Sequence, residues 1–319
     1  MPTTELLGAV GMTLENKQFY SRLLLERAKP NWVYMSYGRK DGIPRNGGNS
    51  IEFRRFERPS ASTSALTEGT RPASTNLTVS NVAATVQQYG AFTFHSEVLE
   101  TQSIDPWIQN VTEMYGEHMA DSLDTVVRDV VVAGTTVQYA STAANRAAVA
   151  SGMNLTYAEI REMVSTLRGN NARGIADGKY IGIVHPDSSA DLFGDSDIVS
   201  AFENAGVRGP GNPMFTGMLD VFYGVRFVET TNAKIFTSAG LSGANVYATM
   251  ICGAGAYGVT DWEAHSPQLL VKTVGSAGAD DPLSQYGTIG WKAALAAVRL
   301  NESFMGRIEH NAAFGVQAA

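Results

Sequence analysis

The sequence is short of cysteine and of positive charge, and each shortage argues against a class of protein. Cys252 is the single cysteine among 319 residues, so the chain forms neither an internal disulfide nor a cysteine-rich metal site. The low cysteine content is typical of proteins in a reducing compartment. We expect Cys252 to be buried as a small apolar residue. The formal net charge is -7, so the chain lacks the excess of positive charge with which proteins bind a phosphate backbone. This argues against a dedicated nucleic-acid-binding protein.

Long apolar runs are absent as well. The amino terminus lacks the basic start and apolar stretch of a signal peptide, and no segment approaches the roughly 20 apolar residues that a membrane span needs. We therefore expect no export by a signal peptide and no membrane insertion. A hydrophobic content of 44% nevertheless predicts a globular protein with a sizeable core.

Motifs for catalysis and for cofactor binding are incomplete. "GAGAYG" at 253–258 matches the dinucleotide fingerprint, but no helix pattern follows it, so we expect a turn between strands. His185 and Asp187 could supply half of a hydrolytic triad, but no G-x-S-x-G elbow provides the nucleophile. A local hydrogen bond at the end of a strand is favoured for His185. The five histidines show no metal-site spacing, so we expect no enzyme, no cofactor and no metal.

A long helix is the clearest expected element. Asp105 is a good N-cap with Pro106 at the first helical position, and the helix should run over 105–134, about 28 residues or roughly 42 Å. Apolar residues recur along it at helical spacing: Trp107, Val111, Met114, Tyr115, Met119, Leu123, Val126, Val127, Val130 and Val131. The opposite face carries four acids and one base: Glu113, Glu117, Asp121, Asp124 and Arg128. An ordinary solvated face is favoured there over a face that repels anions.

The segment that precedes this helix reads as two long strands joined by a polar tip. Five of the eight residues over 51–58 are charged, although only 17% of the chain is. Asn46-Gly47 is a hairpin-turn signal, and Phe53 and Phe56 fall on opposite faces, so neither face can be buried whole. Either this is a solvated hairpin with a bulge, or both faces meet something outside the domain. A tip over 59–76 and an uncharged return over 77–94 complete the expected loop.

The remaining sequence mixes helices and strands. Thr156 and Glu159 form a capping box for a helix that Gly169 and Asn170 end. Strands are expected at 180–186, 224–230, 245–253 and 268–274. The segment 286–311 is ambiguous, because Trp291 and its neighbours fit a helical face whereas 305–309 alternate as a strand.

Several segments together resemble the major capsid proteins of tailed bacteriophages, which have the HK-ninety-seven-like (Johnson) fold, and more closely those of the N-four-like phages. They include "LLLERAKPN" (23–31), "IPRNGGNSIEFRRF" (43–56), "LTEGTRP" (66–72), "VQQYGAF" (86–92), "LDTVVRDVVVAGTTVQYA" (123–140), "IVHPD" (183–187), "YGVRFVETTNAK" (223–234) and "GTIGWKAALAAVRLNESFMGRIEH" (287–310). These segments span nearly the whole chain in order.

The resemblance implies an α+β fold in five parts. Residues 1–45 would form an N-arm and 46–95 an extended β-hairpin loop. Residues 96–155 would form a peripheral domain with a spine helix over 105–134, 156–279 an axial domain, and 280–319 a return to the peripheral domain. The ambiguous segment 291–300 would then be a strand.

The function that the resemblance implies is that of a major capsid protein. It would self-assemble as pentamers and hexamers into the icosahedral shell around the genome of a tailed double-stranded DNA phage, in the host cytoplasm, and become part of the virion. Its partners would be other copies of itself, a separate scaffolding protein, a portal, a possible decoration protein and packaged DNA as a non-specific neighbour, with no membrane. The alternatives are a bacterial encapsulin-like nanocompartment shell and a small-molecule enzyme.

Under this resemblance the charged residues of the extended loop become inter-subunit contacts, where ion pairs set register more than affinity. The candidate residues are Glu52, Arg54, Arg55, Glu57, Arg58, Glu68 and Arg71. Some members of this fold class join subunits through a lysine on the loop, but residues 51–94 contain no lysine. We therefore expect a non-covalent shell.

Overall fold

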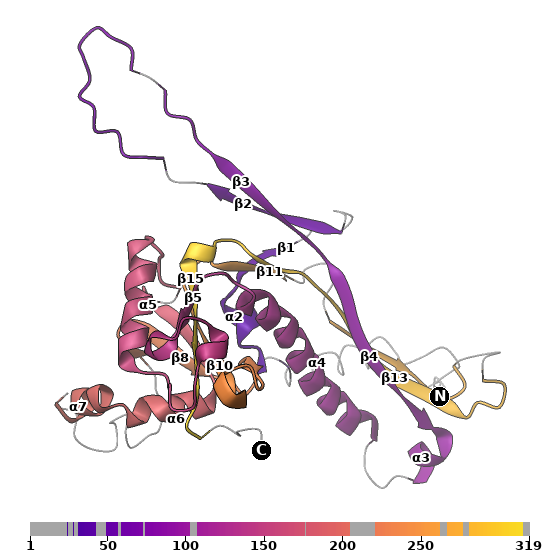
Figure 1. The fold of residues 1–319 in the computed structure, drawn as a ribbon. Coiled ribbons are helices and arrows are strands. Elements are labelled where there is room, and N and C mark those ends of the chain that lie inside the picture. The colour runs from indigo at the N-terminus through magenta and orange to yellow at the C-terminus, as the bar shows by residue number, and fades with distance from the viewer. Residues whose placement is uncertain are drawn as a thin grey trace.

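The computed structural model describes residues 24, 28, 31–42, 49–56, 59–72, 74–102, 107–175, 177–204, 221–261, 267–276 and 281–314. Within them a long hairpin projects from a body made of two parts (Figure 1). One part is a long helix beside an antiparallel sheet, and the other is a mixed sheet with three shorter helices around it. The fold is α+β, as predicted.

The strands of the described residues form four sheets. The projecting hairpin pairs β2 (Ser50–Phe56) with β3 (Val79–Thr85), and a second sheet has the order β12 (Gln268–Lys272), β13 (Tyr286–Leu295), β4 (Gln87–Ser96). A third sheet contains β1 (Arg39–Gly42), β11 (Tyr257–Asp261) and β14 (Ala297–Arg299). The largest sheet has the order β5 (Val137–Tyr139), β15 (Met305–His310), β10 (Val246–Cys252), β6 (Tyr180–Val184), β8 (Val225–Glu229), β7 (Val221–Phe222), with β9 (Ile235–Phe236) paired to β10.

The helices differ widely in length. They are α2 (Tyr34–Tyr37), α3 (Glu97–Gln102), α4 (Trp107–Val132), α5 (Tyr157–Gly169), α6 (Pro186–Gly194) and α7 (Ser196–Asn204). Short 3-10 turns lie at Ala140–Thr142, Arg146–Ala148, Leu241–Gly243 and Glu302–Phe304. In the segment expected to form the N-arm, Leu24 and Ala28 are helical and fully buried.

The long helix predicted over 105–134 is confirmed as α4, whose 26 residues span about 39 Å. The expected cap at Asp105 and Pro106 lies outside the described residues. Of the ten side chains of the predicted apolar stripe, five are buried and four are partly buried. Met114 belongs to the stripe by its spacing but is 69% exposed, because no element of the described chain covers it.

Asp124 also departs from the prediction, because it is fully buried and not part of a solvated acidic face. Its Oδ1 accepts a hydrogen bond from the Met35 backbone N–H at 3.1 Å, and its Oδ2 accepts one from Asn232 Nδ2 at 3.2 Å. Arg128 Nη1 donates to Asn232 Oδ1 at 2.7 Å. Burial raises the pKa of Asp124 to about 6. The carboxylate therefore ties α4 to the segment 31–37 and to the loop before β9.

The antiparallel sheet packs one face on α4. Trp291 of β13 is buried and donates from Nε1 to His118 Nδ1 on the helix at 3.1 Å. Ile289, Trp291 and Ala293 alternate toward this core, which settles the ambiguous segment as β13 and β14 rather than as a helix. The strand that the resemblance implied at 291–300 is thus confirmed.

The mixed sheet matches the expected strands at 180–186, 224–230, 245–253 and 268–274, except that the last of these, β12, joins the antiparallel sheet. The capping box forms, with Glu159 Oε2 accepting from the Thr156 N–H at 2.7 Å. Glu309 of β15 is fully buried between Arg146 and Arg307. The domain boundaries remain a prediction, and five ladders of the described residues cross them: β1 with β11, β11 with β14, β12 with β13, β10 with β15 and β4 with β13.

The projecting hairpin has one continuous register, from Ser50 opposite Thr85 to Phe56 opposite Val79. Of the two alternatives for this hairpin, the one with a bulge is therefore wrong within these residues. The uncharged return run divides at Val86, because β3 stays with β2 while β4 leaves to pair with β13. The Asn46-Gly47 turn lies outside the described residues, and the strands on either side of it, β1 and β2, pair with β11 and β3 instead of with each other.

Candidate assembly surfaces

The base of the hairpin is anchored to the body by a small apolar cluster. Ile51 and Phe53 of β2 are buried against Ala296 and Leu300. Gly258 makes this approach possible, since a Cβ there would lie 2.6 Å from the Phe53 ring. The last glycine of "GAGAYG" thus admits a phenylalanine of this chain. Beyond this anchor the hairpin leaves the body (Figure 1).

The predicted contact residues lie on exposed parts of this hairpin. Glu52, Arg54 and Arg55 are exposed on β2, and they lie opposite the uncharged residues Ala83, Asn81 and Ser80 of β3. Arg55 Nη1 donates to the Leu300 carbonyl at 3.5 Å, which is a long hydrogen bond.

Two further candidates belong to the tip of the hairpin. Glu68 and Arg71 lie in the tip, where every described residue from 59 to 78 is exposed. Glu57 and Arg58 lie outside the described residues. The structure therefore brings three of the seven candidates together on β2 and places two more in the tip.

A cleft of about 350 Å³ opens beside β2, between the hairpin and the body. Its lining combines positive charge with aromatic rings: Arg39, Phe53, Arg54, Arg55, Phe56, Gly255, Leu300, Asn301 and Phe304. Phe56 is 75% exposed at its rim. Arg39 is paired with Asp41 at 3.1 Å. In a chain of net negative charge this cleft is locally cationic, and it suits an acidic partner surface.

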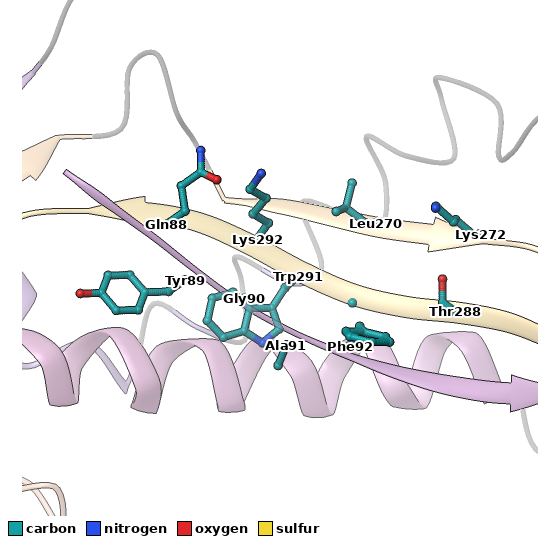
Figure 2. Close-up of a pocket in the computed structure, with 11 residues that line it drawn as sticks. Gln88, Tyr89, Gly90, Ala91, Phe92, Leu270, Lys272, Thr288, Trp291 and Lys292 are labelled. Carbon is teal, nitrogen blue, oxygen red and sulfur yellow. The ribbon is translucent and has the colours of Figure 1, made fainter. Parts of the chain in front are cut away.

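The outer face of the antiparallel sheet forms a second exposed surface, with a hollow of about 510 Å³ (Figure 2). Gly290 lies between Leu270 and Phe92 in the ladder, and a Cβ there would lie 2.7 Å from the Phe92 Cβ, so the glycine allows Phe92 to pack over this point of the sheet. Lys292 extends away from α4 whereas its neighbour Trp291 extends toward it, as Figure 2 shows. Phe92 is 65% exposed.

Sequence reasoning missed this surface. The signal was available within β4, because aromatic residues alternate onto both of its faces, with Tyr89 on one and Phe92 and Phe94 on the other. Such a strand has an apolar side chain on each face, and a core covers only one. Leu270 and Lys292, however, come from distant parts of the chain and could be placed beside Phe92 only by the fold.

A third hollow, of about 290 Å³, lies between the first turns of α4 and the edge strand β4. Its lining is mostly apolar: Thr93, Trp107, Val111, Met114, Tyr115 and His118. The Trp107 Nε1 donor is buried and has no hydrogen-bond partner. We call this hollow the α4 groove.

The residues of the rival enzyme interpretation occupy ordinary structural positions. His185 caps α6, and its Nδ1 accepts from the Asp187 N–H at 3.2 Å, as predicted; burial lowers the pKa of His185. Residues 253–256 form a turn between β10 and β11, with no helix. Cys252 is fully buried, and burial raises its pKa to about 12.

No group of three or more metal-ligating side chains gathers in the part of the chain that the structure describes. Likewise, none of the helices over those residues has the length and apolar character to cross a membrane.

A family model and solved structures both match the chain. A model of the family described as phage capsid protein matches residues 80–307. The chain is similar to a solved capsid of Ralstonia phage GP4, with a TM-score of 0.71 and 10% identity over 98% of this chain and 96% of that one. It is also similar to the capsid of cyanophage Pam1, with a TM-score of 0.67 and 16% identity over 98% of both chains. No curated protein matches the chain.

Proposed function

The chain belongs to the phage capsid protein family and is a phage major capsid protein with the HK-ninety-seven-like fold, and from this premise we propose how it assembles. Capsid proteins associate with copies of themselves into the shell of the virion. We propose that this chain does so as pentamers and hexamers, in an icosahedral shell around the double-stranded DNA of a tailed phage, in the host cytoplasm. The narrower resemblance to the N-four-like phages stays part of this proposal.

The projecting hairpin is the observation that carries the proposal. A two-stranded hairpin alone is marginally stable in water, and here only its base is packed, on Ile51 and Phe53. Arg54 and Phe56 are both exposed, and with Arg55 they line the cationic cleft. An element with this little support in its own subunit is stabilised when neighbouring copies cover it. We propose that Glu52, Arg54, Arg55, Glu57, Arg58, Glu68 and Arg71 contact those copies.

The remaining partners follow from the same proposal. A separate scaffolding protein would set the curvature of the first shell, a portal would occupy one vertex, and a decoration protein could bind outside. The predicted division into N-arm, extended loop, peripheral domain and axial domain describes which parts meet at which symmetry axes. The proposed function needs no catalytic group.

The packaged DNA would be a non-specific neighbour of the shell. The exposed acids of α4, Glu117 and Asp121, would repel its phosphates if that face is turned inward. DNA could then slide without adhering. Binding of DNA to assembled shells at low salt measures this directly, because an adhering inner surface would retain the DNA.

The second candidate is a nanocompartment shell. The fold is also similar to that of a virus-like particle from Pyrococcus furiosus, with a TM-score of 0.53 and 11% identity over 92% of this chain and 100% of that one, so the fold by itself does not separate the two candidates. An adjacent gene for a cargo enzyme would favour this candidate, whereas adjacent terminase and portal genes would favour the phage shell.

Sedimentation combined with electron microscopy tests the proposed assembly. The chain would be expressed alone and then together with its neighbouring open reading frames. The proposal expects rings of five and six, or closed shells, in the fast fraction. Particles of one or two chains under both conditions would contradict it and would reopen the enzyme alternative.

A further inference from the structure

The outer face of the antiparallel sheet has the features of a binding site. Phe92 and Phe94 are each 65% exposed there, and Leu270 is 48% exposed, while the opposite face of the sheet packs on α4. The rings of Phe92 and Phe94 lie edge to face, with their centroids 5.2 Å apart. Large apolar side chains that gather on one exposed face mark a contact site for another molecule.

The strand register fixes the layout of this face. Gly290 of β13 lies between Leu270 of β12 and Phe92 of β4. Lys292 lies two residues beyond Gly290 on β13, and Lys272 lies two residues beyond Leu270 on β12. Because these two strands are antiparallel, the lysines lie at opposite ends of the hollow, which has a volume of about 510 Å³. Their backbones are about 14 Å apart, given a rise of about 3.3 Å per residue and about 4.8 Å between strands.

The hollow carries positive charge and no negative charge. Lys272 and Lys292 are exposed, and the described residues that line the hollow include no aspartate or glutamate. Within the described part of the chain neither lysine forms an ion pair. Lys292 and Leu270 both extend from the side of the sheet that faces away from α4, as Figure 2 shows. An occupant with negative charge at both ends and an apolar group between them therefore complements this face.

An extended polypeptide segment matches this layout. In a strand the residues i, i+2 and i+4 line one face, and i and i+4 lie about 13 Å apart. Acids at i and i+4 therefore reach the two lysines while an apolar residue at i+2 enters the hollow. In a helix the same two positions lie only about 6 Å apart, so a helical segment reaches one lysine at a time. A nucleic acid fits less well, because two lysines on a chain of net charge -7 offer few contacts to phosphates.

This chain does not supply such a segment. Acids four residues apart occur four times in the whole sequence: Glu113 with Glu117, Glu117 with Asp121, Asp187 with Asp191, and Asp191 with Asp195. The first two pairs lie on α4, and the other two lie on α6 and its C-cap. Each pair is therefore held at helical spacing, so no extended segment of a second copy carries the pattern. The matching segment then belongs to a different protein.

We propose that the outer face of the sheet β12-β13-β4 binds an extended acidic segment of a different protein. Its acids at i and i+4 lie over Lys292 and Lys272, and its apolar side chain at i+2 lies between Leu270 and Phe92. Phe94 extends the apolar contact along β4. This inference goes beyond self-assembly and rests on no feature of the shell, so it can fail while the proposed function stands.

Binding of designed peptides to the wild-type chain tests this inference. The probe is a fluorescently labelled peptide with glutamate at i and i+4, phenylalanine at i+2 and threonine elsewhere, because threonine favours an extended conformation. Three control peptides carry lysine for both glutamates, alanine for phenylalanine, or the two glutamates side by side. The full-length chain is titrated below its assembly concentration, and the probe should bind at least about fivefold more tightly than each control.

Charge reversal in the chain locates the binding. Lys272→Glu with Lys292→Glu should weaken binding of the probe by at least about tenfold, and this variant should bind the lysine peptide more tightly than the wild type does. The matched control is Lys40→Glu with Lys179→Glu, which changes the net charge equally at positions outside this sheet. It should bind both peptides like the wild type.

The apolar anchor has a test of its own. Phe92→Ala should weaken binding of the probe by about fivefold, because the ring forms one side of the hollow. The matched control is Phe56→Ala on the hairpin, which should leave binding unchanged. Both rings are mostly exposed, so neither variant should unfold.

Four results would overturn the inference. The first is equal binding of the probe and of the peptide with adjacent glutamates, or no binding of any peptide, and this comparison stands even if a variant fails to fold. The second is tighter binding of a single-stranded oligothymidylate than of the probe, since the face would then take nucleic acid. The third is unchanged binding of the probe by the Lys272 and Lys292 variant. The fourth is a rise in the concentration at which that variant self-assembles without peptide, because the face would then be an interface between copies.

Discussion

Reversing two charges on the hairpin should block the shell while leaving the subunit folded. Arg54→Glu with Arg55→Glu alters two exposed side chains, and the hydrogen bond from Arg55 to the Leu300 carbonyl is long, at 3.5 Å. The free energy of unfolding of the unassembled chain should therefore change by less than about 1 kcal/mol. Urea denaturation followed by circular dichroism measures that change.

The effect on assembly should be much larger. An exposed ion pair contributes about 0.2–1 kcal/mol, and each reversal replaces one such attraction with a repulsion of similar size. Two reversals therefore remove roughly 1–4 kcal/mol of contact free energy per copy. Since 1.4 kcal/mol corresponds to a factor of ten, the subunit concentration needed for shells rises roughly fivefold to a thousandfold.

Sedimentation velocity over a dilution series gives that concentration for each variant. The matched control is Arg54→Lys with Arg55→Lys, which keeps both charges and should assemble close to the wild-type concentration. If the glutamate variant forms shells at the wild-type concentration, the hairpin arginines do not contact other copies and the argument from charge fails. If its unassembled form is unfolded, the hairpin base supports the fold more than the structure indicates.

Three further predictions concern pH and covalent state. His310 is fully buried, and burial lowers its pKa to about 4. As the pH falls below about 6.5, this histidine takes up a proton in the unfolded chain but stays neutral in the folded chain. The free energy of unfolding should therefore fall by about 3 kcal/mol as the pH drops from 6.5 to 4. Urea denaturation of His310→Gln between pH 7 and 4 should lack this loss, and an unchanged slope would contradict the assignment. Asp124 has the opposite effect, because burial raises its pKa in the folded chain to about 6. The free energy of unfolding should therefore rise by about 3 kcal/mol as the pH falls from 6 toward 3.8. Asp124→Asn should lack this rise in the same urea titration, and a variant that keeps the rise would refute the assignment to Asp124. Boiled shells on a denaturing gel should run as a single band of 34.1 kDa, since residues 51–94 hold no lysine, and a ladder of linked chains would exclude a non-covalent shell.

Local patterns predicted the elements whose signals lie within one segment. The capping box at Thr156 and the apolar spacing of α4 gave the two main helices close to their observed bounds, because caps and helical periodicity act within a few turns. The strands β6, β8 and β10 were predicted from buried apolar runs. His185 was predicted correctly for the same reason, since its hydrogen bond goes to Asp187.

Long-range contacts explain where the structure departs from the local sequence patterns. Asp124 lies among acids along the helix, but the segment 31–37 and Asn232 cover it, and nothing near 124 in sequence shows that. Met114 fits the apolar stripe, yet no described element covers it. The break at Val86 carries no glycine or proline, and it exists because β13, two hundred residues away, pairs with β4.

The candidate surfaces divide in the same way. The charged residues of β2 could be identified from local composition alone, because a strand with charge on both faces has no place in a core. The hollow on the outer sheet face and the α4 groove could not. Each combines residues from separate segments, such as Phe92 with Leu270, or Thr93 with Trp107, and only the fold places them together.

A reconstruction of the fast-sedimenting particles by electron cryomicroscopy tests the central claim most directly, because it shows what covers the hairpin. The account predicts rings of five and six copies in which β2 and β3 of each copy, with Arg54 and Arg55, lie against a neighbouring copy. A shell in which every hairpin stays in solvent or contacts only its own subunit would contradict the account.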